Sequence, residues 1–259
     1  MYKKYNYIPS QKYNTLINPY RQQGLDLFNS YKNDVELSLD KYIADDNVID
    51  GTALQSNWFK QYDMSIFISH SHNDRNKALS LAGWIYENFG INSFIDSCIW
   101  GYGNDLLKKI DNKYCRNNDG KTYSYERRNF STSHVHAMLS MALMQMINQT
   151  ETIIFVNTPN SISLKADFNS LNKDNSETKS PWIYEELSIM NYIKLTIPER
   201  LNTIKHQFRK SSDDAFDVEY NVDEYLRQMI LLSDDDLDKW KRNHDSSANA
   251  LNELYILKK

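Results

Sequence analysis

The sequence predicts an α/β fold, with a parallel sheet covered by helices on both faces and a helical extension at the N-terminus. From about residue 61 onward, short β-rich segments alternate with segments of helical spacing. Thr152–Val156 is apolar at every position, which is typical of a strand covered on both faces. The order strand, helix, strand, helix, strand indicates a doubly wound sheet.

Composition and charge narrow the class of protein. The 259 residues are 41% hydrophobic and 25% charged, as in ordinary globular domains, and suffice to bury a core. The net charge of -4, without a local basic stripe, argues against nucleic acid as a partner. Two cysteines are too few for a disulfide framework and indicate a reducing cytosol. With no secretory signal and no long apolar run, we expect a cytoplasmic protein without a membrane segment.

Residues 1–60 are polar and rich in tyrosine and asparagine. An amphipathic helix is indicated by residues three or four apart, namely Phe28, Tyr31, Val35, Leu39 and Tyr42. We therefore interpret this region as a helical extension that packs on the main domain.

Residues 61–200 form the predicted α/β domain. Met64–Ile68 is expected to be the first strand, and the apolar spacing from Ala78 to Phe89 predicts a helix that ends before Gly90. Ser93–Asp96 is the second strand, followed by a loop that contains Gly101 and Gly103.

The remainder alternates between polar and apolar segments. Helices are expected over Asp105–Tyr114 and Val135–Ile147, and the polar segments Arg116–Arg128 and Asp167–Lys179 are expected to be loops. Residues 201–259 complete or extend the domain, with a strand near Glu219–Val222 and a helix that opens at Asp234.

Three polar segments follow predicted strands. They are Ser69–Asp74, Asp96–Gly103 and the turn after Val156 that leads into Ser180–Leu187. Because ligands bind beyond the carboxyl ends of parallel strands, we expect these segments to form a pocket together.

The last of these segments places two carboxylates at the start of a helix. Ser180 is a good N-cap and Pro181 a good first helical residue. At about 100° per residue, Glu186 lies about 60° from the face formed by Ile183, Leu187 and Met190, one turn after Trp182. Glu185 lies opposite that face and is expected in solvent. The alternative is that both are surface acids that interact with the helix dipole.

The motifs together resemble a Toll/interleukin-1 receptor (TIR) domain, which has a flavodoxin-like parallel sheet. Ser65–Ser71, Ser93–Asp96 and Ile153–Pro159 are similar to the first three strands of the family, and Ser97–Gly103 occupies the place of its BB loop. Trp182–Glu186 matches the W-x-x-x-E element. The resemblance covers about residues 61 to 195, and Asn104–Ser133 is extra length.

Enzymatic members of the family cleave the nicotinamide–ribose bond of NAD+. The resemblance implies that NAD+ is a substrate and not a cofactor, and that Glu186 is the catalytic carboxylate. Candidate substrate-binding residues are Ser69, His70, Ser71, His72, Asp96, Trp100 and Trp182. Some animal members carry arginines at the positions of Ser71 and His72, so the phosphate contacts of the family do not transfer directly.

The resemblance also implies a biological role. The chain is similar to stand-alone bacterial TIR proteins of Thoeris-like antiphage systems, in which a nucleotide signal reaches a separate effector. The product would be ADP-ribose, a cyclic isomer or a base-exchange conjugate, and activity would depend on self-association through TIR surfaces. The alternative function is a non-enzymatic adaptor that acts by TIR–TIR association.

Several candidates have simpler explanations. Core packing is an equal alternative for Trp182, and the simpler alternatives are that Trp100 fills a turn and that Asp96 caps a loop. His70, His72 and Asp74 would share one side of an extended segment, but a turn is expected there, so we predict no metal site. His134 and His136 are expected on different sides of a helix.

Overall fold

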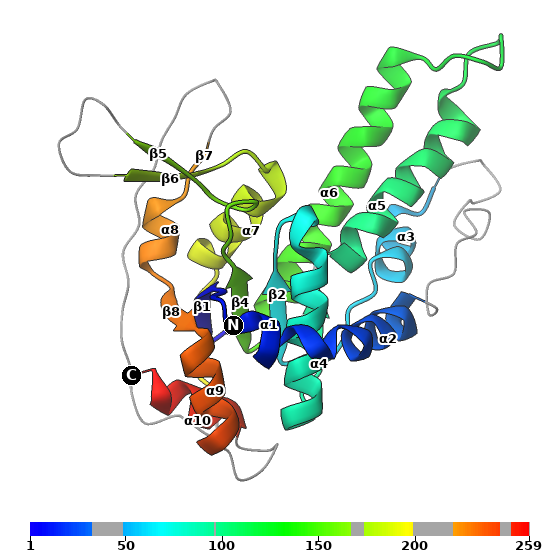
Figure 1. Ribbon diagram of the computed structural model, residues 1–259. Coiled ribbons are helices and arrows are strands. Elements are labelled where there is room, and N and C mark those ends of the chain that lie inside the picture. Colours follow the sequence, from blue (N-terminus) through cyan, green and yellow to red (C-terminus); the bar gives the residue numbers. More distant parts are fainter. Residues whose placement is uncertain (33–48, 96, 167–173, 199–219, 244–249, 259) are drawn as a thin grey trace.

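The computed structural model describes the whole chain except residues 33–48, 96, 167–173, 199–219, 244–249 and 259. It contains a five-stranded sheet in which every pairing is parallel, flanked by helices (Figure 1). The predicted α/β, flavodoxin-like class is therefore confirmed.

The described elements follow one another along the chain. The strands are β1 (Lys3–Ile8), β2 (Ile66–Ser69), β3 (Ser93–Ile95), β4 (Thr152–Val156), β5 (Ser163–Ala166), β6 (Asp174–Thr178), β7 (Tyr220–Asn221) and β8 (Ile230–Ser233). The α-helices are α1 (Tyr13–Leu16), α2 (Arg21–Lys32), α3 (Gly51–Trp58), α4 (Arg75–Phe89), α5 (Ser97–Ile110), α6 (Tyr125–Gln149), α7 (Pro181–Tyr192), α8 (Asp223–Arg227), α9 (Asp234–Asn243) and α10 (Ala250–Leu257). Shorter helical turns are η1 (Asn18–Tyr20), η3 (His72–Asp74) and the π turn η4 (Asp111–Cys115).

The order of strands across the main sheet is β3-β2-β4-β1-β8. A flavodoxin-like sheet has the strand order 2-1-3-4-5. In that scheme β2, β3 and β4 correspond to strands 1, 2 and 3, and β8 corresponds to strand 5. Strand 4 is supplied by β1, from the N-terminus of the chain. The region 1–60 is therefore not a purely helical extension, because its first strand lies inside the sheet.

The strand β1 is held in the sheet by buried tyrosines and by a carboxylate. Tyr5 and Tyr7 are fully buried and pair in register with Ile154 and Val156 of β4. The hydroxyl of Tyr7 donates a hydrogen bond of 2.5 Å to Asp234 at the start of α9. Burial is the largest cause that raises the pKa of Tyr7 above its ordinary value, so its phenol stays a donor.

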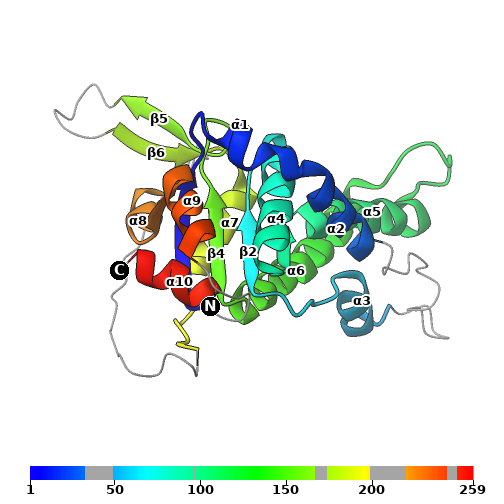
Figure 2. The same ribbon diagram turned by 60° about the horizontal axis from the view of Figure 1, so that its bottom comes forward.

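Helices cover both faces of the sheet, as the fully apolar strands require. Figure 2 shows α4 and α9 on one face, with α6 and α7 behind the strands on the other. Trp240 of α9 stacks on Phe89 of α4 with ring centroids 4.0 Å apart, and Trp84 packs beside it at 5.9 Å. The aromatic cluster thereby joins α9 to α4.

The helix α2 packs directly on α4 through two glycines. A Cβ atom on Gly24 would lie 1.7 Å from the carbonyl oxygen of Leu79, and one on Gly83 would lie 2.2 Å from that of Tyr20. No other residue type permits so close an approach of two helix backbones. The predicted amphipathic helix of the extension corresponds to α2 as far as Lys32, and its positions Val35, Leu39 and Tyr42 lie outside the described residues.

Three loop predictions are wrong. The helix α5 begins at Ser97, so the segment with Gly101 and Gly103 is helical, and Gly103 is buried against Leu139 of α6. Packing on α6 outweighs the low helix propensity of glycine. The helix α6 begins at Tyr125, ten residues before the predicted start, and residues 174–178 form the strand β6 that pairs antiparallel with β5.

The predicted extra length, Asn104–Ser133, is a helical arm. It consists of most of α5, the π turn, a tight turn around Gly120 and the first part of α6, and it projects from the body in Figure 1. Elsewhere the predicted strand Thr152–Val156 and the helices ending at Phe89 and starting at Asp234 match the structure. None of the described helices has the length and apolar surface that a bilayer crossing requires.

Candidate functional site

Three segments meet at the carboxyl end of the main sheet. The turn η3 follows β2, the connection to β5 follows β4, and α7 starts at the same end of the molecule (Figure 1). Two of the three polar segments predicted from the sequence are thus brought together there.

The helix α7 starts as the sequence predicts. The hydroxyl of Ser180 accepts a hydrogen bond of 3.3 Å from the backbone N–H of Ile183, and Pro181 is the first helical residue. Ile183, Leu187 and Met190 are buried, so the predicted core face is confirmed.

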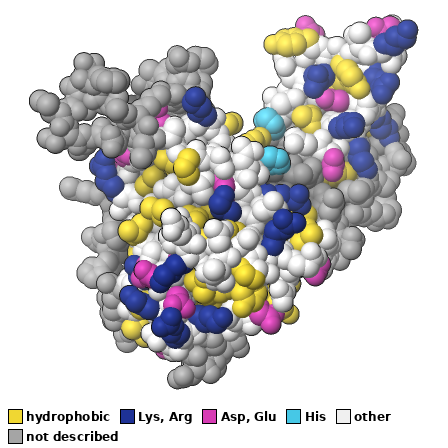
Figure 3. Space-filling view, viewed as in Figure 1, with side chains coloured by type: hydrophobic (Ala, Val, Ile, Leu, Met, Phe, Trp, Pro, Cys, Tyr) yellow, Lys and Arg dark blue, Asp and Glu magenta, His cyan; other side chains and the backbone are white. Residues whose placement is uncertain are grey.

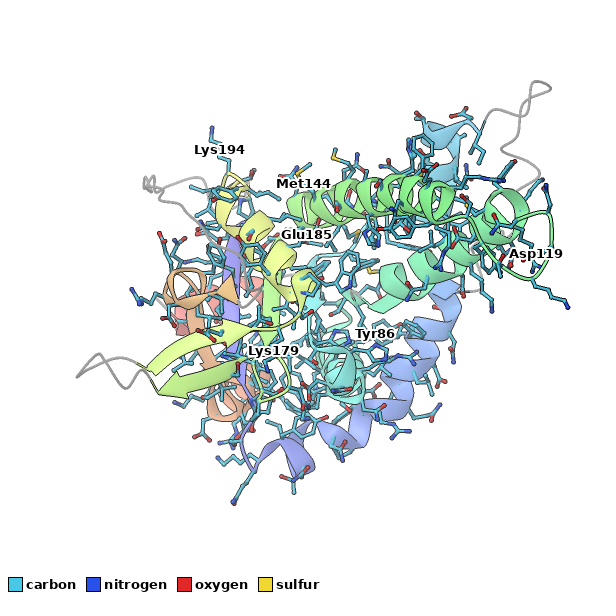
Figure 4. All side chains as sticks on the ribbon, turned by 90° about the horizontal axis from the view of Figure 1, so that it is seen from above. Tyr86, Asp119, Met144, Lys179, Glu185 and Lys194 are labelled. Atoms are coloured by element: carbon cyan, nitrogen blue, oxygen red, sulfur yellow. The ribbon has the colours of Figure 1, made fainter. Side chains whose placement is uncertain are left out.

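Glu186 lies deeper than expected. Glu186 is 0% exposed, whereas helix pitch alone places its side chain at the border of the core. The hydroxyl of Ser69, the last residue of β2, donates a hydrogen bond of 2.5 Å to Oε2 of Glu186. Two predicted site residues from distant parts of the sequence therefore touch. Glu185 is partly exposed and lies on α7 near α6 (Figure 4), so it meets more solvent than Glu186, as predicted, but less than a surface acid.

The segment after β2 turns sharply. Ser69, His70 and Ser71 are buried and His72 is exposed. The hydroxyl of Ser71 caps η3 by accepting a hydrogen bond from the backbone N–H of Asn73 at 3.4 Å. Because η3 is a helical turn, its side chains do not share one side as they would in an extended segment.

Asp74 joins the loops that follow β2 and β4. Its Oδ1 accepts hydrogen bonds from Lys77 Nζ at 2.6 Å and from Asn160 Nδ2 at 3.0 Å. Its Oδ2 accepts a short hydrogen bond from the hydroxyl of Thr158. The carboxylate is fully buried, so this network, which sequence reasoning missed, fixes the two loops relative to each other. The available signal was a run of turn-forming residues, Asn157 to Ser161, directly after a buried strand.

Trp182 packs against α6. Its ring makes an edge-on contact with His136, with centroids 5.2 Å apart, and the indole is half-buried. His134 instead packs on Phe130 at 4.5 Å, which confirms that the two histidines lie on different sides of the helix. Figure 3 shows a hollow in the surface between the helical arm and the body, with histidine side chains on its wall.

Two predicted site residues are not placed. Asp96 lies outside the described residues, and Trp100 lies on α5 in a part where only the backbone is described. Its expected position in a loop is wrong, since that backbone is helical.

Within the part of the chain that the structure describes, no three His, Cys, Asp or Glu side chains are arranged to hold a metal ion. The candidate site consists of one buried carboxylate, one hydroxyl that orients it, and the buried histidine that follows Ser69 in sequence. Such a carboxylate can stabilise positive charge that develops on a bound molecule. Comparison with protein-family models, curated proteins and solved structures finds no match for this chain, so its functional interpretation depends on its own residues and geometry.

Proposed function

We propose that this protein cleaves the nicotinamide–ribose bond of NAD+ and that Glu186 is its catalytic carboxylate. The observation that carries the proposal is the hydrogen bond between Ser69 and the buried Glu186 at the carboxyl end of a parallel sheet. Ligands bind at this end in open α/β sheets. The resemblance of the sequence motifs to enzymatic TIR domains supplies the reaction.

The chemistry requires one negative charge beside the ribose. As the bond between nicotinamide nitrogen and ribose carbon breaks, its electron pair leaves with nicotinamide and the sugar gains oxocarbenium character. A carboxylate of low hydration stabilises that charge more strongly than one in water. Attack by water then gives ADP-ribose and a proton, and attack by a nitrogen of the adenine ring gives a cyclic isomer.

Ser69 would orient the carboxylate and would not react itself. A hydroxyl that donates to Oε2 holds the side chain in one rotamer, so that its negative charge has a fixed position when substrate binds. Since Glu186 is fully covered in this conformation, substrate contact requires the groups above it to move.

In the cell, the reaction would produce a nucleotide signal for a separate effector or deplete NAD+ during phage infection. Self-association is expected to accompany activity. Both statements extend the resemblance to Thoeris-like TIR proteins.

One alternative function is a non-enzymatic TIR adaptor that acts by association with other TIR domains. Two observations favour it. The complete burial of Glu186 also fits a purely structural acid, and α6 exposes large apolar side chains, with Phe130 69%, Met141 45% and Met144 37% exposed.

Nicotinamide release from NAD+ by the purified protein tests the proposal. We expect Glu186→Gln to lower the rate by about 100-fold or more, because the loss of one group that stabilises transition-state charge has an effect of this size in other enzymes. Glu185→Gln is the matched control, because it makes the same change one residue away on the same helix, and it should retain most of the rate. Mass spectrometry identifies the product.

The assay is repeated at protein concentrations that favour assembly. Absence of turnover in every form at all concentrations supports the adaptor. Equal losses in the two variants, with circular dichroism unchanged, would exclude Glu186 as the catalytic group.

A further inference from the structure

The helical arm contains a hollow that is separate from the candidate NAD+ site. It has a volume of about 240 Å³ and lies between α5 and α6, and its lining residues are Asn104, Leu107, Lys108, Asp111, Tyr123 and Arg128. In Figure 4 the tip of the arm, marked by Asp119, lies far from Glu185 on α7. Nothing in the proposed reaction uses this part of the molecule.

The base of the hollow is the carboxylate of Asp111, which forms an ion pair with Arg128. Oδ1 of Asp111 accepts a hydrogen bond of 2.6 Å from the hydroxyl of Ser131, and Oδ2 accepts one of 2.9 Å from Nε of Arg128. The side chain of Asp111 is 9% exposed and that of Arg128 is 52% exposed. The buried acid therefore orients the guanidinium and leaves its outer side in the hollow.

Three groups on the wall have donors that the fold does not use. Among the described residues, the terminal nitrogens of Arg128, the ammonium of Lys108 and the amide of Asn104 make no hydrogen bond to protein. Asn104 and Lys108 are four residues apart on α5, so they lie on one face with Asp111. These donors point to an acceptor-rich ligand.

Tyr123 forms a wall that is unsuited to stacking a base. Its ring already contacts the guanidinium groups of Arg116 at 5.6 Å and Arg128 at 5.5 Å, and its hydroxyl donates to Asn112 at 2.6 Å. A planar ligand would have to displace these cations. The volume is also below the roughly 300 Å³ at which pockets for drug-sized ligands begin, so the ligand should be compact.

The charge around the hollow is positive. Its lining carries Lys108 and Arg128 against the single acid Asp111, which leaves one net positive charge. Over residues 104–133 there are seven lysines and arginines and four acids, although the whole chain has a net charge of -4. Figure 3 shows lysine and arginine side chains on the arm, with acidic ones among them.

We propose that this hollow binds a compact phosphate-bearing anion, whose oxygens accept hydrogen bonds from Lys108, Arg128 and Asn104. A phosphate group is attracted by the net positive charge of the lining, and its tetrahedral oxygens suit donors that converge from two helices. The inference does not depend on the proposed NAD+ reaction.

Isothermal titration calorimetry with pyrophosphate tests the site in the full chain. We expect saturable binding by the wild type that weakens as salt rises, and a loss of about tenfold or more in Lys108→Glu. Lys108 is the position of choice because its ammonium bonds to none of the described residues, whereas loss of Arg128 would leave Asp111 buried without its ion-pair partner. Lys121→Glu is the matched control, since it makes the same charge change at an exposed position of the arm. It should bind within about twofold of the wild type, because a charge at the surface is screened by solvent and salt.

Further titrations identify the source of the phosphoryl group. Tighter binding of ribose 5-phosphate than of inorganic phosphate indicates a sugar phosphate, and the reverse order indicates the free ion. Glu186→Gln should bind pyrophosphate as the wild type does, whatever its effect on nicotinamide release. The proposal is overturned if pyrophosphate does not bind, if acetate binds equally well, or if Lys108→Glu and Lys121→Glu lose affinity equally.

Discussion

Replacing Thr158 by valine tests how the two loops of the candidate site are fixed. The hydroxyl of Thr158 donates to Oδ2 of Asp74, a carboxylate with no exposed surface. Valine has nearly the same shape, so the substitution removes the donor without opening a cavity. Asp74 keeps its bonds from Lys77 and Asn160 but loses the donor on its other oxygen.

The expected cost follows from the charge of the acceptor. A hydrogen bond to a charged group contributes about 1.5–3 kcal/mol, compared with about 1 kcal/mol for a neutral pair. The carboxylate cannot turn to water, because it is buried and is held by two other donors. We therefore expect Thr158→Val to lower the free energy of unfolding by about 2–3 kcal/mol.

Urea unfolding at pH 7, followed by circular dichroism, measures the effect. Thr52→Val is the matched control, since Thr52 is exposed on α3, and it should change the free energy of unfolding by less than about 0.5 kcal/mol. In the Asp74→Asn background the cost of Thr158→Val should fall by about 1–2 kcal/mol, because the acceptor is then neutral. A cost of Thr158→Val no larger than that of the control would refute the assignment of the network.

Three further outcomes are expected. Gly24→Ala should lower the free energy of unfolding by about 3 kcal/mol, because its methyl group meets a backbone oxygen of α4. Gly51→Ala is the control, because its methyl group meets only a flexible side chain, and it should cost less than about 1 kcal/mol. Similar costs in urea unfolding would contradict the close crossing of the two helices. Burial lowers the pKa of Lys4 to about 8, so the unfolded chain binds more protons than the native one from about pH 8 to pH 10.5, and stability rises with pH there. At pH 7 we expect Lys4→Met to have a higher free energy of unfolding than the wild type, because it buries no charge. That difference should shrink by about 1–2 kcal/mol between pH 7 and pH 10, and a constant difference in urea unfolding would count against the prediction. A double-mutant cycle with Ser69→Ala and Glu186→Gln should give a coupling energy of about 1–2 kcal/mol, because glutamine can still accept a neutral hydrogen bond from Ser69, and a value below about 0.5 kcal/mol would show that the charge of Glu186 does not strengthen the contact.

The parts of the fold that the sequence predicts well are those with a strong local signal. Thr152–Val156 is apolar on both faces, and the helix α4 combines regular apolar spacing with Gly90 in a left-handed conformation at its end. Ser180 and Pro181 likewise set the start of α7, which made the position of Glu186 calculable from helix pitch.

The errors arise where distant contacts outweigh local preference. The strand β1 has the sequence KKYNYI, in which lysine and asparagine interrupt the strand-favouring tyrosines and isoleucine, and its pairing partners in β4 are almost 150 residues away. The start of α5 carries two glycines, yet its packing on α6 keeps it helical. The depth of Glu186 also escaped prediction, because helix pitch gives the direction of a side chain but not the thickness of what covers it.

The position of β1 has a consequence for the candidate site. It pairs with β4 on one side and β8 on the other, so the N-terminal segment separates the two parts of the sheet that belong to the middle and the end of the chain. Asp234 ties its carboxyl end to α9 through Tyr7 and Ser10, and the backbone N–H of Asn157, just beyond β4, bonds to the carbonyl of Tyr7. The turn that carries Thr158 therefore starts from a strand end that β1 holds in place. Because that turn in turn anchors Asp74, the geometry around Ser69 and Glu186 depends on the first ten residues of the chain, although none of them contributes a proposed catalytic group.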